Sequence, residues 1–426
     1  MFNSKPFRRS RGAYAGYCTF EYFATLLITD AFLATLLTSI GISDSAIGII
    51  MSVSSFAFLF QLISVFIAGK IKYIKPLAMV LSTASQLCYM FLYLVPFLTV
   101  SLQIKTALVF IFILCGYMFN YVTAAFIFKW GNSFVSPSKR ASFSATKEMI
   151  SLISGMAFSL LAGFITTSYQ NTGNLQGSFI FISITLLINN ICTFISLSCI
   201  QKKSPCDEKQ EKIPVLNALK YLFTNKSYLK VVLMFAAKSF SLAFTLGFLG
   251  TFKTKDLLIS ISTVQIINII ASLFRFLLSK PFGKYSDKYS FVKGYKLVLY
   301  LEVLAFVCIL FLNSPEKWWI IIPYTILYNI SLAGTNANAS NIIYSYVDTN
   351  YFVHATAIKN VITGITSFTT AILASKVFDY IQTNGNSIFG ISLYPQQFLA
   401  AITIVALIIT IIFIKTKIEK LEIKMQ

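Results

Sequence analysis

The sequence predicts an all-α polytopic membrane protein with twelve transmembrane helices in two six-helix halves. Of the 426 residues, 56% are hydrophobic and only 12% are charged, which is about half the charged fraction of an ordinary soluble domain. Apolar runs of about 20 residues, the length that crosses the hydrocarbon core of a bilayer, recur along the chain. These observations exclude soluble, disordered and fibrous proteins, and an internal repeat groups the helices into halves.

Twelve apolar segments account for the predicted helices. Each is long enough to cross about 30 Å of hydrocarbon at a rise of about 1.5 Å per residue. The segments cover residues 14–41, 45–69, 76–99, 106–129, 143–168, 178–200, 228–251, 261–281, 295–313, 318–345, 356–380 and 396–415. The polar stretch 201–227 separates an N-terminal half, 1–200, from a C-terminal half, 228–426. Apolar residues at helical spacing after Pro214 predict a short amphipathic helix in this linker.

Lysine and arginine predict the orientation in the membrane, because cytoplasmic loops collect positive charge. We expect both termini, the 201–227 linker and the 281–295 loop to be cytoplasmic in a multi-pass protein of the cell membrane. The outer loops then hold four of the 35 Lys and Arg residues, namely Lys105, Lys253, Lys255 and Lys317. This asymmetry explains the net charge of +20, so we predict a lipid bilayer and no nucleic acid as a partner.

The chain resembles itself at a shift of 212 residues. This shift places Ser133–Gly163 over Ser345–Ser375 without a gap, and eight of the 31 aligned pairs are identical. One identical pair is Lys147 and Lys359, in the fifth and eleventh segments. About two or three identities are expected by chance in a composition of this kind. Two six-helix halves in parallel repeat are an architecture of secondary transporters.

Two loop motifs and the helix arrangement resemble the major facilitator superfamily over essentially the whole chain. Gly283-Lys-Tyr-Ser-Asp287-Lys288, between the eighth and ninth segments, is similar to the family's Gly-x-x-x-Asp-Arg/Lys loop. Pro137-Ser-Lys-Arg140-Ala141, before the fifth segment, is similar to another basic loop of the family. The equivalent loop of the first half keeps Gly69 but has Tyr73 where the family has an acid.

The resemblance implies the MFS fold and alternating access, in which the two halves move around a solute site near the middle of the membrane. It places helices 1, 4, 7 and 10 around a central cavity. It also implies a cytoplasmic gate in which Asp287, beside Gly283 and Lys288, pairs with Arg140 and Lys147. The opposite contact, between the second and eleventh helices, is predicted to be apolar because the first half lacks its acid.

Two acids in the first segment, Glu21 and Asp30, are candidates for proton coupling. An ionisable group deep in a membrane helix costs about 2.5–3.5 kcal/mol on insertion scales and is a functional candidate by default. The acids are nine residues apart and therefore on opposite helix faces. Glu21 continues into a polar stripe with Thr25 and Thr29, whereas Asp30 lies nearer the midplane. The alternative is a structural carboxylate that pairs with a neighbouring helix.

Lys238 is the buried cation of the seventh segment, about 15 Å deep, on a stripe with Ser241 and Thr245. Because the seventh segment repeats the first, we predict that Lys238 and Asp30 face each other across the cavity. This pair either opens when solute or proton arrives, or is a permanent salt bridge.

Amides and hydroxyls on the fourth and tenth segments are the candidate solute ligands. They are Tyr117, Asn120 and Thr123 on the fourth segment, and Asn329 and Asn336 on the tenth. Neutral donors and acceptors of this kind suit a polar solute. The alternative is interhelical hydrogen bonding, which contributes only about 0.6 kcal/mol per bond on average in membrane proteins.

The remaining ionisable residues indicate neither a metal site nor an enzyme. Arg275 and Glu302 are predicted to form a structural pair between neighbouring segments. His354 is the single histidine, and the seven cysteines are scattered without ligand spacing. No phosphate-binding glycine loop is present, so we expect no cofactor and no direct use of ATP.

The function predicted from these features is secondary active transport. We expect a monomer that moves a small polar solute by alternating access in proton symport. Two alternatives remain open: an exporter of drugs or metabolites with the same fold, and a membrane sensor or receptor that binds its ligand without flux. The fold does not select a solute.

Overall fold

The computed structural model describes residues 5–67, 74–135, 140–201, 215–348, 351–388 and 391–421. Nearly all of the described chain is helical. The helices up to the central linker are α1 (Lys5–Leu27), α2 (Asp30–Ile40), α3 (Asp44–Phe56), α4 (Gln61–Ile67), α5 (Ile74–Leu92), α6 (Leu102–Asn132), α7 (Arg140–Asn171) and α8 (Leu175–Cys199). The helices after it are α9 (Val215–Thr224), α10 (Lys226–Ala243), α11 (Leu249–Thr251), α12 (Ile261–Tyr289), α13 (Phe291–Leu310), α14 (Ile321–Tyr346), α15 (Phe352–Thr383) and α16 (Pro395–Phe413). A two-stranded hairpin, β1 (Ser387–Ile388) and β2 (Ile391–Ser392), precedes α16.

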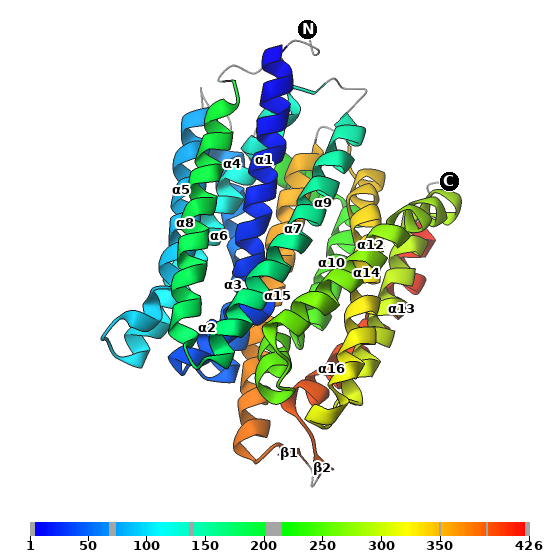
Figure 1. Ribbon diagram of the computed structural model, residues 1–426. Coiled ribbons are helices and arrows are strands. Elements are labelled where there is room, and N and C mark those ends of the chain that lie inside the picture. The colour runs from blue at the N-terminus through cyan, green and yellow to red at the C-terminus, as the bar shows by residue number, and fades with distance from the viewer. Residues whose placement is uncertain are drawn as a thin grey trace. The chain divides into compact units, whose positions relative to one another are not determined.

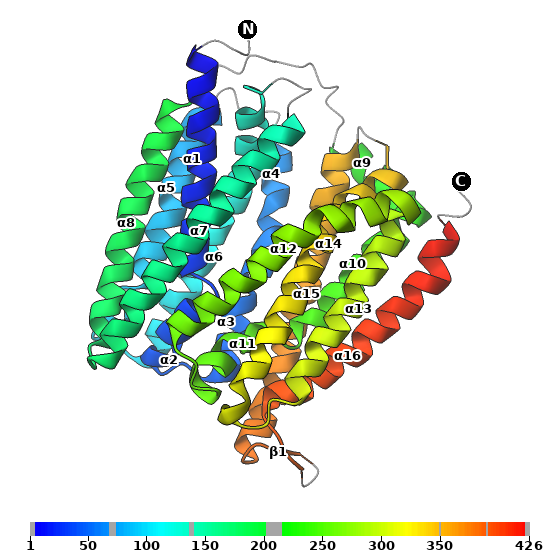
Figure 2. The same ribbon diagram turned by 45° about the vertical axis from the view of Figure 1, so that its right-hand side comes forward.

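The chain forms two compact helical units (Figure 1). The first unit contains Met1–Ile42 and Phe60–Lys212, and the second contains Ser43–Leu59 and Ile213–Gln426. Long helices predominate in both units, and the turned view in Figure 2 separates α10, α12 and α13 of the second unit. The all-helical membrane fold class predicted from the sequence is therefore confirmed.

A helix, or a run of consecutive helices, occupies each of the twelve predicted apolar segments. By length and composition, eight helices in the described ranges can cross a membrane, or nine if α1 and α2 form one span. Two of the other helices carry more charged or polar residues: α13 contains Lys293, Lys296 and Glu302, and α14 is rich in asparagine. The count of twelve spans remains a prediction.

The first predicted segment is broken near its middle. Helix α1 ends at Leu27, α2 begins at Asp30, and the two axes differ by 43°. Asp30 itself has a φ of 49°, in the left-handed region that non-glycine residues rarely adopt. The break is unexpected, because neither proline nor glycine stands there.

Helix α3 packs within the second unit along α15. A β-carbon on Gly364 of α15 would lie 2.2 Å from the backbone oxygen of Ser55, so the helices approach closely only because glycine stands there. Beside this contact, the rings of Phe56 and Phe368 lie 4.8 Å apart. At the start of α3, Asp44 Oδ2 accepts hydrogen bonds from Lys255 Nζ at 2.6 Å and from Gln382 Nε2 at 2.9 Å.

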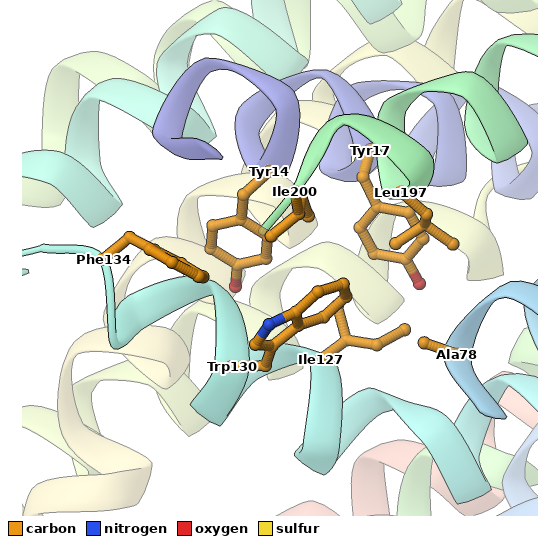
Figure 3. Packing of buried hydrophobic residues seen from close by; sticks show 8 residues of the cluster. All are labelled: Tyr14, Tyr17, Ala78, Ile127, Trp130, Phe134, Leu197 and Ile200. Carbon is orange, nitrogen blue, oxygen red and sulfur yellow. The ribbon is translucent and has the colours of Figure 1, made fainter. Parts of the chain in front are cut away.

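An aromatic cluster fills one part of the first unit. Figure 3 shows its members, which come from α1, α5, α6, α8 and the residues that follow α6 and α8: Tyr14, Tyr17, Ala78, Ile127, Trp130, Phe134, Leu197 and Ile200. The indole nitrogen of Trp130 donates to the backbone oxygen of Gln201 at 3.1 Å. The cluster thus fixes α1 against three neighbours of the same unit.

Candidate functional site

Glu21 lies on α1 in the interior of the first unit. Its Oε2 accepts a hydrogen bond from Asn120 Nδ2 of α6 at 2.8 Å, and the amide of Gln86 also lies against the carboxylate. Oε1 is buried and has no hydrogen-bond partner in the described part of the chain. No ion pair to Glu21 occurs there either. The structure therefore places two predicted residues, Glu21 and Asn120, in direct contact.

The predicted polar stripe on α1 is used differently. The hydroxyl of Thr25 donates to the backbone oxygen of Glu21, and that of Thr29 donates to the backbone oxygen of Thr25. Both hydroxyls are therefore bonded to their own helix. Thr123 behaves in the same way on α6, because its buried hydroxyl donates to the oxygens of Phe119 and Asn120.

Tyr117 belongs to an aromatic group around the same carboxylate. Its ring centroid lies 5.7 Å from that of Tyr89 and 5.9 Å from that of Tyr121. Tyr89 in turn lies near Glu21. The acid is thus bordered by amides and by phenol rings, with the rings on α5 and α6.

Lys238 forms a buried ion pair in the second unit. Its Nζ lies 2.7 Å from Glu302 Oε1 of α13, and the side chains of the two residues are 8% and 0% exposed. The ammonium also donates to Thr335 Oγ1 of α14 at 2.9 Å, and the Ser331 hydroxyl donates to Glu302 at 3.2 Å. The ring of Tyr295 lies below the ammonium at 5.0 Å.

This geometry corrects two predictions about charge pairs. The partner that the structure gives to Lys238 is Glu302, not Asp30, so the counter-charge comes from within the same unit. Glu302 consequently does not pair with Arg275, which makes no ion pair among the described residues. The Lys238 ammonium therefore has both its counter-charge, Glu302, and its hydrogen-bond acceptor, Thr335, within the bundle of α10, α13 and α14.

The hydroxyl stripe that continues from Lys238 faces another helix. Thr245 and Thr403 of α16 share a hydrogen bond of 2.8 Å, and Thr403 donates to the backbone oxygen of Ser241 at 2.9 Å. All three residues are fully buried. The stripe that the sequence assigned to a cavity is therefore a packing surface between α10 and α16.

The amides of α14 form local contacts. Asn329 Nδ2 donates to the backbone oxygen of Thr325, one turn earlier. The side chain of Asn336 lies outside the described residues. Asn338, which the sequence analysis did not single out as a ligand, is fully buried, and its Oδ1 has no partner in the described structure.

Comparison with known proteins decides the family. The model of the Major Facilitator Superfamily matches residues 15–371. The chain belongs to the Major Facilitator Superfamily. The predicted resemblance is thereby confirmed, and the family shares the fold described above. Comparison with curated proteins finds no match.

Solved transporters of the Major Facilitator Superfamily fold superpose on nearly the whole chain. A mutant of the nucleoside transporter NupG has a TM-score of 0.70 at 15% identity, covering 97% of this chain and 99% of that one. The POT family transporter PepTSo has a TM-score of 0.68 at 12% identity, covering 97% and 98%. A bacterial metal transporter has a TM-score of 0.64 at 11% identity, covering 96% and 98%. Identities this low show a shared fold alone.

The residues of the family's loop motifs lie at helix ends. Asp287, Gly283 and Lys288 occupy the last turns of α12, where Asp287 is exposed and Lys288 Nζ lies 5.2 Å from the centre of the Tyr289 ring. Arg140 is the first residue of α7, and its side chain lies outside the description.

Lys147 and Lys359, the identical pair of the internal repeat, make equivalent contacts. Lys147 Nζ lies 4.9 Å from the centre of the Tyr14 ring of α1. Lys359 Nζ lies 5.3 Å from the centre of the Phe235 ring of α10. Each lysine thus lies over an aromatic ring on the first long helix of its own half, α1 or α10. The internal repeat is therefore visible in side-chain contacts as well as in the sequence.

Two amides that the sequence analysis missed complete the surroundings of Glu21. Gln86 of α5 and Asn189 of α8 are both buried and bonded to each other. Their signal was available, since each is a polar residue in the middle of an apolar segment. Neither residue lies on helices 1, 4, 7 or 10, which are the helices that the resemblance places around the cavity.

Proposed function

We propose that this member of the Major Facilitator Superfamily is a secondary active transporter that carries a small polar solute by alternating access in symport with protons. The observation that supports this most is the environment of Glu21. One oxygen of its carboxylate is buried, the other accepts a hydrogen bond from the neutral amide of Asn120, and no ion pair to it occurs among the described residues. Burial without a counter-charge disfavours the ionised form of an acid, which suits a group that takes up and releases a proton.

The membrane potential can supply the energy for such a cycle. A potential near 100 mV contributes about 2.3 kcal/mol for each charge that crosses. At about 1.4 kcal/mol per factor of ten, this corresponds to roughly 40-fold accumulation of a neutral solute. Proton symport therefore needs no nucleotide site.

The polar character of the solute is supported by Glu21, Asn120 and Tyr117, which lie together in the first unit. Nucleoside and peptide transporters are among the solved structures with this fold, so nucleosides and short peptides are the first solutes to examine. Import is the direction that symport with an inward proton gradient favours.

Orientation and gating complete the proposal. Both termini and the central linker face the cytoplasm, and the transporter works as a monomer in the cell membrane. Asp287 closes the cytoplasmic side by pairing with Arg140 and Lys147. The exposed position of Asp287 in the last turn of α12 supports this role.

The decisive experiment is uptake into proteoliposomes. The purified protein is reconstituted, nucleosides, short peptides and other polar solutes are offered in turn, and uptake is measured with and without an inward proton gradient. Glu21→Gln should abolish accumulation against a gradient and leave solute exchange intact, because Gln retains an acceptor for Asn120 but cannot release a proton. Glu148→Gln, on the exposed side of α7, is the matched control and should behave like the wild type.

Two results would contradict the proposal. Binding without flux for every solute would favour a sensor, and uptake that ignores the proton gradient in the wild type would exclude symport. Transport that occurs only outward, measured in inside-out vesicles, would favour the exporter.

A further inference from the structure

A line of buried polar side chains joins α1, α5 and α8 in the first unit. Gln86 Nε2 of α5 donates to Thr193 Oγ1 of α8 at 2.9 Å. Asn189 Nδ2 of α8 donates to Gln86 Oε1 at 3.2 Å and to the backbone oxygen of Phe20 of α1 at 2.8 Å. Gln86 and Thr193 are 0% exposed and Asn189 is 5% exposed. We call this line, together with Ser82 and Glu21, the amide seam.

Helix α8 connects the other two helices of the amide seam. Helix α8 contacts both α1 and α5, and the two views in Figures 1 and 2 show the three running side by side. The seam reaches Glu21 through Gln86, whose amide lies against the carboxylate. It continues one turn toward the start of α5 at Ser82, where the Tyr17 side chain of α1 lies close by.

Several oxygens on this seam have no hydrogen-bond partner in the described structure. They are Glu21 Oε1, Ser82 Oγ and Asn189 Oδ1. A buried polar atom without a partner costs about 1–3 kcal/mol, and native proteins contain only a few. A concentration of unpartnered oxygens on these three helices therefore indicates a bound species that donates hydrogen bonds.

We propose that the amide seam holds ordered water and is the route by which Glu21 exchanges its proton. The inference rests on the proposed symport. A buried water makes about three hydrogen bonds and needs two to four polar partners. Water on the seam would donate to the Glu21 carboxylate and to the Asn189 carbonyl, and would accept from the Ser82 hydroxyl. Such water connects the acid to the part of the seam near Tyr17.

The other titratable groups near the seam are weak acids and one cation. Tyr17 and Cys18 lie on α1, Tyr89 lies on α5, and Tyr117 lies on α6. Lys147 of α7 lies near Cys18 but is held over the Tyr14 ring. Glu21 is thus the one carboxylate on the described seam, so a proton that travels along it has a single carboxylate acceptor.

The test compares two replacements of Asn189 in proteoliposomes. Asn189→Leu fills the seam with an apolar side chain and should slow proton-driven uptake about tenfold, the factor that corresponds to about 1.4 kcal/mol. Asn189→Ser leaves space and a hydroxyl for water and should stay within about twofold of the wild type, or about 0.4 kcal/mol. Thr185→Val is the control, because the Thr185 hydroxyl donates to the backbone of its own helix.

Solute exchange without net proton movement separates this inference from the proposed function. Exchange should be unchanged in all variants, since it does not require Glu21 to release its proton. If the wild type shows no proton-driven uptake, symport itself fails before the seam is examined. If symport holds but Asn189→Ser is as slow as Asn189→Leu, the amide is structural and the inference is wrong. If Asn189→Leu does not fold, Ser82→Val is measured against Ser82→Ala with the same expectation.

A sodium ion is the competing occupant, because the unpartnered atoms are all oxygens. Replacement of sodium by choline in the uptake buffer should leave proton-driven transport unchanged. Loss of accumulation in choline, with recovery on return of sodium, would overturn the proposal in favour of a cation site.

Discussion

Glu21 in the first unit and Glu302 in the second are both carboxylates on helices of a bundle, but Glu302 is fully buried and Glu21 is partly buried. Each has one oxygen engaged and one without a partner among the described residues. The engaged oxygen of Glu21 accepts from a neutral amide, whereas that of Glu302 accepts from the Lys238 ammonium at 2.7 Å. The difference is the presence of a counter-charge.

The counter-charge decides what each acid can do. Two opposite charges in contact attract strongly in a low dielectric, so the contact between Glu302 and Lys238 holds α13 against α10. Glu21 forms no ion pair among the described residues, so its protonation leaves no cation without a counter-charge. The same residue type therefore produces a fixed contact in one unit and a group suited to proton exchange in the other.

The largest expected effect on stability is at the ion pair. Glu302→Gln leaves the Lys238 ammonium buried without a counter-charge, and removal of one partner of a buried pair costs about 3–5 kcal/mol. Thermal or denaturant unfolding of the purified protein in detergent measures this loss. The double variant Lys238→Met with Glu302→Leu removes both charges and should recover most of it, because apolar replacement of a whole pair is often neutral. A Glu302→Gln protein as stable as the wild type would refute the comparison.

A second ion pair of the second unit provides an intermediate case. Asp44 is 4% exposed, but the side chain of its partner Lys255 is 47% exposed. Water already solvates Lys255, so Asp44→Asn should cost only about 1–2 kcal/mol, near the lower range for a charged hydrogen bond. The cost should shrink in high salt, which screens exposed charges, while that of Glu302→Gln should not. Unfolding measured at two salt concentrations distinguishes the two pairs.

Features that depend on local sequence were predicted from the sequence, whereas features that depend on which helices pack together were not. Apolar segments are visible in the sequence because membrane insertion depends on local composition, and each of them is helical in the structure. The partner of Lys238 was predicted wrongly because it depends on which of several helices packs there, and Glu302 was assigned to Arg275 instead. The packing of Ser43–Leu59 with the second unit is likewise tertiary, since it rests on contacts such as Gly364 with Ser55.

The site was predictable only in part, for similar reasons. Glu21 and Asn120 stood out because polar residues in membrane helices are rare, and the structure joins them. Gln86 and Asn189 carried the same signal but lie on helices without a predicted role. The helix break before Asp30 had no sequence marker, because the residues around it are ordinary helix formers and threonine.

Asp30 supplies the third test, because it is the other acid of the first predicted segment. Its left-handed backbone is more favourable for glycine than for alanine by about 1 kcal/mol. Asp30→Gly should therefore be more stable than Asp30→Ala by that amount in detergent unfolding. If the position requires only the left-handed backbone of Asp30 and not its carboxylate, Asp30→Gly should also retain proton-driven accumulation. Loss of accumulation in Asp30→Gly with normal exchange would transfer the coupling role from Glu21 to Asp30.

The smallest expected effect on stability accompanies Glu21→Gln. This change leaves no buried cation without a counter-charge, and the new amide oxygen still accepts a hydrogen bond from Asn120. The free energy of unfolding should therefore shift by less than about 0.5 kcal/mol. Accumulation should nevertheless be lost, because the side chain no longer carries a proton. Glu302→Gln should show the reverse ranking, with a large loss of stability and, in the molecules that remain folded, retained coupling. If Glu21→Gln destabilises the protein as much as Glu302→Gln does, both acids are structural, and the proton must be carried by another group.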